Sequence, residues 1–154
     1  MKIEIARELV RTALAEARRL QLAPLAVTVL DAGGNLVCFE RENGAGIARF
    51  DISFAKAWGS LGMGFPSREL ARRTAQHPAF FAMVSTATDG RMAASPGGLR
   101  IADQSGAVIG AIGISGDTGD NDEMCALEAI AAAGLRDADQ ESGQVRDGAP
   151  ANSR

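Results

Sequence analysis

His77 is the only imidazole among the 154 residues, and the chain has no tyrosine. A metal site built from several histidines is therefore excluded, and a Ser-His-Asp triad could form only around this residue. A single imidazole is enough, however, to act as the axial ligand of a haem iron within apolar walls. Four apolar residues could form such walls, or could equally belong to the hydrophobic core, and they are Trp58, Phe80, Phe81 and Met83.

Lys56 is one of two lysines, and the other, Lys2, lies at the N-terminus. Lys56 is either a solvated surface charge or a group that acts on a ligand. Arg100 follows a glycine pair, and an arginine on a strand either pairs with a structural carboxylate or holds an anionic ligand. The pair itself, Gly97 and Gly98, either lets the chain bend into a sheet or lines a pocket.

Four carboxylates lie where the last helix is predicted to begin, and they are Asp117, Asp120, Asp122 and Glu123. Their spacing does not fit an EF-hand, because the position that requires glycine is Asp122. The helix dipole favours such carboxylates at a helix N-terminus, and Asp120 with Glu123 has the spacing of a capping box. Cys38 and Cys125 have no recognisable partner and are predicted to be buried, inert thiols.

The composition is that of an ordinary globular domain, with 46% hydrophobic and 23% charged residues. The net charge of −3 gives no basic field for nucleic acid or anionic lipid. Two cysteines cannot form a disulfide framework, and no apolar run approaches the ~20 residues of a membrane span. We expect a soluble, cytoplasmic protein that binds neither nucleic acid nor membrane.

Hydrophobic periodicity and turn residues predict the order helix, hairpin, helices, hairpin, helix. The expected elements are a helix over about 5–20, strands over 25–30 and 36–39, a helix over 48–63, a short helix capped by Ser67, an apolar stretch over 79–84, a loop over 85–98, strands over 99–102 and 107–115, and a helix over about 120–135. Glycines 110 and 113 within the last strand indicate a bulge or a close approach of backbone or ligand.

This order lacks the rhythm of a parallel sheet, so we predict an α+β fold, an antiparallel sheet flanked by helices in two or three layers. Residues 1–136 are expected to form the single domain. The polar residues 137–154 are expected to be a disordered tail.

Three segments occur in an order that is typical of one family. The first is VTVLDAGGNLV over 27–37, followed by Glu40-Arg41, and the second is DISFAKA over 51–57. The third is GGLRI over 97–101, followed by VIGAIGISG over 108–116 and by Asp122-Glu123. Together they resemble the GlcG/HbpS-like proteins, the haem-degrading domain family, over about residues 5–135.

The resemblance implies a profilin-like fold and assembly into dimers or larger oligomers, up to octamers. It also implies haem binding, which is established for part of the family, where a first-helix histidine is the ligand in some members. Residues 4–21 contain no histidine here, so ligation would move to His77 or to a methionine.

The leading hypothesis is therefore an oligomeric protein that binds haem or a similar tetrapyrrole, with His77 as the iron ligand. The residues expected to contact the propionates or line the site are Arg41, Lys56, Gly97, Gly98 and Arg100.

Two alternatives remain open, the first being a catabolic enzyme that acts on a small organic acid. In that enzyme Arg41 and Arg100 would hold the substrate carboxylate. Glu40, Lys56 or Asp122 would then serve as general acid or base. The second alternative is a structural or regulatory subunit that binds no small molecule.

Overall fold

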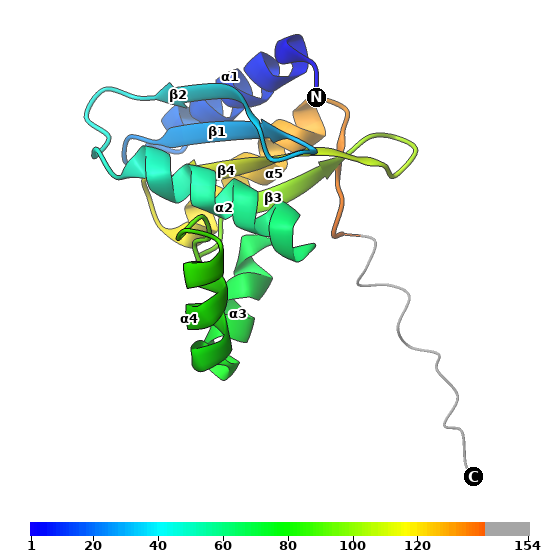
Figure 1. Cartoon of the computed structure of the whole chain (residues 1–154). Coiled ribbons are helices and arrows are strands. Elements are labelled where there is room, and N and C mark those ends of the chain that lie inside the picture. Colours follow the sequence, from blue (N-terminus) through cyan, green and yellow to red (C-terminus); the bar gives the residue numbers. More distant parts are fainter. Residues whose placement is uncertain (141–154) are drawn as a thin grey trace, which may run out of the picture.

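The computed structural model describes residues 1–140, which form five helices and a five-stranded sheet (Figure 1). In chain order the elements are α1 (Ile3–Arg19), β1 (Ala26–Asp31), β2 (Leu36–Arg41), α2 (Arg49–Met63), α3 (Ser67–Gln76), α4 (Pro78–Ala87), β3 (Gly98–Ala102), β4 (Val108–Ser115), α5 (Gly119–Ala132) and β5 (Arg136–Asp137). Among these described residues no helix has the length and apolar character needed to cross a bilayer.

The sheet has the strand order β2-β1-β4-β3-β5, and every neighbouring pair is antiparallel. Both predicted hairpins, β1–β2 and β3–β4, are present, and β1 pairs with β4 to join them. β1 is an inner strand, between β2 and β4, and its first five residues are buried, as its continuous apolar run predicts. The predicted α+β fold with an antiparallel sheet is confirmed.

Helices cover both faces of the sheet, so the protein has three layers (Figure 1). On one face α1 and α5 pack side by side over a core that includes Val27, Val29, Ile112 and Ile114. On the other face α2 packs against a smaller cluster that includes Leu30, Ala57 and Ala111. The third layer continues outward as α3 and α4, which project from the body as an antiparallel pair (Figure 1).

Two glycines allow α2 to lie unusually close to the sheet. A Cβ atom on Gly113 would lie 1.9 Å from the Ser53 carbonyl oxygen, and one on Gly98 would lie 2.2 Å from that of Lys56. Any larger residue would therefore push the helix off the strands. The sequence predicted a close approach at Gly113, and in the structure the backbone of α2 is what lies against this glycine.

Two predicted helix caps are wrong. Ser67 is the first residue of α3 rather than its N-cap, and its Oγ instead accepts a hydrogen bond of 2.7 Å from the Gly98 amide. The N-cap of α5 is Thr118, whose hydroxyl accepts from the Asn121 amide, whereas Asp120 lies in the first turn. The predicted caps lie one and two residues after the observed ones, Pro66 and Thr118. Ser67 makes a tertiary contact instead, whereas the cap of α5 is a local bond between Thr118 and Asn121.

Order extends past the predicted domain boundary at residue 136. β5 pairs with β3 through Ile101 with Asp137 and Ala102 with Arg136, so the first residues of the predicted tail belong to the sheet. Residues 141–154, the rest of that tail, lie outside the described residues. Helix α4 also extends to Ala87, so the predicted loop over 85–98 begins later than expected.

Candidate functional site

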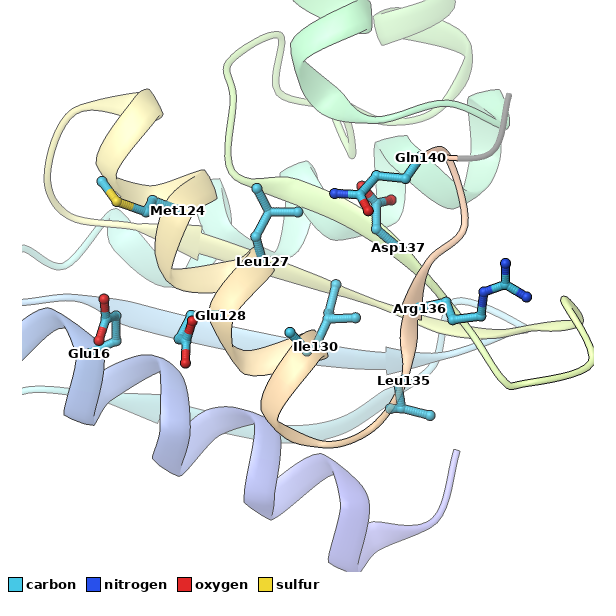
Figure 2. A pocket seen from close by; sticks show the side chains of 10 residues that line it. Glu16, Met124, Leu127, Glu128, Ile130, Leu135, Arg136, Asp137 and Gln140 are labelled. Carbon is cyan, nitrogen blue, oxygen red and sulfur yellow. The ribbon is translucent and has the colours of Figure 1, made fainter. Parts of the chain in front are cut away.

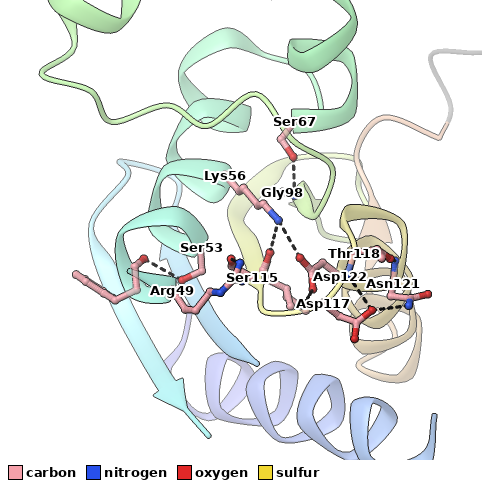
Figure 3. A network of polar contacts seen from close by, with 12 residues as sticks. Arg49, Ser53, Lys56, Ser67, Gly98, Ser115, Asp117, Thr118, Asn121 and Asp122 are labelled. Atoms are coloured by element: carbon pink, nitrogen blue, oxygen red, sulfur yellow. Dashed lines mark hydrogen bonds and ion pairs between the residues drawn. The ribbon is translucent and has the colours of Figure 1, made fainter. Parts of the chain in front are cut away.

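A buried ion pair joins α2 to the start of α5 (Figure 3). The Lys56 ammonium lies 2.9 Å from an Asp122 carboxylate oxygen and donates a second hydrogen bond, of 2.8 Å, to the Ile114 carbonyl oxygen. The two side chains are 3% and 1% exposed. The pair therefore ties together two helices on opposite faces of the sheet at the end of β4.

Burial acts on the two charges in opposite directions. It lowers the pKa of Lys56 and raises the pKa of Asp122, while the charge of each partner opposes these shifts. Neither group reaches solvent, so the geometry gives the pair a structural role, and the acid-base roles remain predictions. Sequence reasoning singled out both residues but did not pair them, because 66 positions separate them.

Gly97 and Gly98 are buried directly against this pair. Gly97 has a φ of +120°, and a Cβ there would lie 3.1 Å from the Lys56 ammonium nitrogen. The Gly97 carbonyl oxygen also accepts a hydrogen bond from the Ile114 amide. Of the two roles open from the sequence, the structure shows the glycines leading the chain into the sheet beside Lys56.

Asp117 makes several hydrogen bonds that the sequence did not predict. Its carboxylate accepts hydrogen bonds from the Ala23 and Thr118 amides and from the Asn121 side chain, and its own amide donates to Asp122 (Figure 3). These bonds, that from Asn121 first, lower the pKa of Asp117. Two members of the acidic cluster thus hold the start of α5 in place.

The predicted arginines lie apart from this pair. Arg100 on β3 forms an ion pair with Asp139, a residue in the predicted tail. Arg41 donates a hydrogen bond of 2.7 Å to the Ala45 carbonyl oxygen. Arg41 and the exposed Glu40 line one surface cavity of about 470 Å³ at the end of β2.

The junction of α3 and α4 lies at the tip of the projecting pair (Figure 1). His77 is the residue between these two helices, and it is exposed. Phe80 and Met83 on α4 are 51% and 65% exposed. Phe81 is buried, and Trp58 lies on α2, where the Arg91 guanidinium stacks 4.5 Å from its ring centroid. Of the four predicted wall residues, two are therefore exposed, and both lie on the helix that begins directly after the histidine.

A cavity of about 680 Å³ lies between α1, α5 and the segment that contains β5 (Figure 2). Met124 and Arg136 line it, and sequence reasoning identified neither residue. Three carboxylates also line it, those of Glu16, Glu128 and Asp137, and burial raises the pKa of Asp137. Their charge disfavours an anionic ligand, so this cavity suits haem propionates less well than its volume indicates.

The structure thus brings four of the predicted residues together and separates the others. Lys56, Asp122, Gly97 and Gly98 form one buried cluster. Glu40 with Arg41, Arg100 with Asp139, and His77 occupy other places on the molecule.

The five-stranded antiparallel sheet with helices on both faces makes this a small α+β protein. Residues 1–131 match the family described as haem degrading protein HbpS-like, and the chain belongs to this family. The resemblance found in its sequence motifs is confirmed.

Individual relatives agree with this assignment. The chain is 29% identical over 116 residues to an uncharacterized 15.0 kDa protein in the dhaT-dhaS intergenic region of Citrobacter freundii, covering 75% of this chain and 80% of that protein. The crystal structure of a PduOC:heme complex is similar with a TM-score of 0.79 and 26% identity, over 89% of this chain and 97% of that one. A double mutant of HbpS from Streptomyces reticuli is similar with a TM-score of 0.73 and 28% identity, over 86% of each chain.

Proposed function

We propose that this protein binds haem and that His77 ligates the iron. Membership of the HbpS-like family and the similarity to a PduOC:heme complex support the choice of ligand. The observation that carries the proposal is that the sole imidazole is exposed at the start of α4, three residues before the exposed Phe80 and six before the exposed Met83. An axial haem ligand needs an accessible imidazole and an apolar surface next to it.

The residues around His77 fit this ligand. Pro78–Ala87 contains no charged side chain, so the porphyrin ring would meet an uncharged apolar helix. Arg72 and Arg73 precede His77 on α3 and share the single carboxylate of Glu69, which leaves one net positive charge for the propionates.

This assignment replaces the arginines and the lysine predicted from the sequence. Arg41, Lys56 and Arg100 each have a partner within the fold and lie away from the α3–α4 junction. When bound, haem would supply an iron centre that can take a further ligand or an electron.

A haemin titration followed by absorbance tests whether α4 is the binding surface. We expect a saturable Soret band for the native chain and a dissociation constant raised about tenfold or more in Phe80→Ser, because an apolar contact is lost. The matched control is Ile47→Ser, since Ile47 is 93% exposed in the loop before α2. A native chain without a saturable band, or equal losses in both variants, would overturn the proposal.

We also propose that two copies of the haem-free protein associate through α4, forming at least a dimer that haem would dissociate because it covers the same side chains. Phe80 and Met83 remain exposed in the isolated chain, and the lack of charge on α4 lets two copies meet without repulsion. We further propose a cytoplasmic location, because Cys38 and Cys125 are free thiols in the described part of the chain and disulfides are rare in the cytosol.

A further inference from the structure

A further pocket lies between α3, α4 and residues 92–94. Its volume is about 270 Å³. The residues that matter here are Leu70 and Thr74 of α3, Phe81, Ala82 and Ser85 of α4, and Met92. The haem proposal rests on the exposed Phe80 and Met83, so this pocket is a separate feature.

The walls of this pocket are fixed by the rest of the fold. Leu70 and Phe81 are 1% and 7% exposed and hold α3 and α4 in place. Met92 packs on Gly59 of α2, where an added Cβ would lie 3.4 Å from the Met92 Cβ. Because the neighbouring Ala93 amide donates to the Ala55 carbonyl oxygen, the third wall is also anchored to α2.

Thr74 is the unusual residue in the lining. Its hydroxyl oxygen is buried, yet it has no hydrogen-bond partner within residues 1–140. A threonine in a helix commonly bonds to the carbonyl oxygen four residues earlier, and on or just after α4 both Thr86 and Thr88 do so, at 3.1 and 2.9 Å. A buried hydroxyl without a partner is unfavourable. Because its oxygen has almost no accessible surface, the Thr74 side chain would have to rotate about χ1 to turn the hydroxyl toward a ligand in the pocket, and a threonine in a helix adopts two χ1 rotamers.

We propose that this pocket binds a small neutral aromatic molecule with one hydroxyl group, that is, a phenol, and that Thr74 hydrogen-bonds to that hydroxyl. The lining contains no charged residue, so the ligand should be neutral. An apolar cavity of about 150 Å³ holds a benzene molecule. A pocket of about 270 Å³ therefore has room for a substituted ring.

Fluorine NMR of the full chain with 4-fluorophenol or fluorobenzene tests this proposal. We expect a saturable shift of the 4-fluorophenol signal. Thr74→Val keeps the shape of the side chain but removes its hydroxyl. It should therefore weaken the binding of 4-fluorophenol about three- to tenfold and leave the binding of fluorobenzene unchanged. Ala82→Leu, on the opposite wall, should weaken the binding of both compounds, because the larger side chain fills part of the pocket.

The matched control is Thr86→Val, which makes the same change on α4 at a residue outside the pocket lining. It should leave both compounds unaffected. The absence of a saturable shift with the native chain would overturn the proposal. So would equal affinity of the native chain and Thr74→Val for 4-fluorophenol, or binding that persists undiminished in Ala82→Leu. Haemin plays no part in this experiment, so its outcome is independent of the haem proposal.

Discussion

Lys56 and Asp122 are charged groups with almost no contact with solvent, and each depends on the other. Replacing Lys56 by methionine would leave the Asp122 carboxylate buried and unpaired. We expect Lys56→Met to lower the free energy of unfolding by about 3–5 kcal/mol, measured by urea denaturation. The double variant Lys56→Met/Asp122→Leu removes both charges and should recover a large part of this loss.

The control is Arg19→Met, because Arg19 forms a surface ion pair with Glu16 and is 67% exposed. Such pairs contribute about 0–1 kcal/mol, so this variant should be nearly as stable as the native chain. Equal effects of Lys56→Met and Arg19→Met would contradict the structural role of the buried pair.

The two cysteines should differ in reactivity. Burial raises the pKa of Cys125 to about 11 and also raises the pKa of the half-buried Cys38. Because the thiolate is the reactive form, Cys125 should stay unmodified by a disulfide reagent at pH 8 until the chain unfolds, while Cys38 reacts slowly. Two thiols reacting at one fast rate in the native protein would show that Cys125 is not buried. Cys125→Ser, which leaves only Cys38, assigns the rates.

Residue types alone could single out chemistry but could not place it. The rarity of lysine and histidine drew attention to Lys56 and His77, and the structure gives them opposite environments, one buried and one exposed. The pairing of Lys56 with Asp122 and of Arg100 with Asp139 was not predicted, because a contact between distant positions leaves no periodic signal in the sequence. Long-range pairs form only when the sheet brings its ends together.

Helix α3 carries a compact charge network that should respond to acid. Ion pairs with Arg72 and Arg73 lower the pKa of Glu69 from 4.5 to about 2. Since the pKa is lower in the folded chain, the carboxylate stabilises the fold above about pH 4.5, and this contribution is lost as the pH falls toward 2. Glu69→Gln should cost about 0.5–1 kcal/mol at pH 7, because the pairs are partly exposed.

The difference in the free energy of unfolding between Glu69→Gln and the native chain should therefore shrink as the pH is lowered. Urea denaturation at pH 7, 4 and 3 measures it. Glu8→Gln, at an exposed residue of α1, is the matched control for a lost carboxylate. A difference that stays constant or grows in acid would show that these ion pairs do not hold the pKa of Glu69 down.

Elements with a clear local pattern were predicted well. The two hairpins and α1, α2 and α5 follow from alternation, apolar stripes and turn residues, which depend only on neighbouring positions. Helix α4 was expected only as an apolar stretch, because a continuous apolar run does not show the stripe of an amphipathic helix. β5 was missed because two residues carry no pattern, and its pairing with β3 is a tertiary effect.

The exposed apolar surface of α4 has a consequence for the whole molecule. If two copies of the haem-free protein associate through it, light scattering of the native chain without haem should give at least twice the chain mass of 16.0 kDa. The double variant Phe80→Ser/Met83→Ser should shift the mass toward that of a single chain, whereas Ile47→Ser should not. A native chain that is monomeric at high concentration would rule out this association.

The central claim is that haem binds at His77 and not in the larger cavity that contains Met124. The most direct test is a haemin titration of the native chain, His77→Ala and Met124→Leu, followed by the Soret band. We expect the saturable band to be lost in His77→Ala and retained in Met124→Leu, because only the former removes the iron ligand. A band that survives in His77→Ala and disappears in Met124→Leu would contradict the claim and move the site to the cavity between α1 and α5.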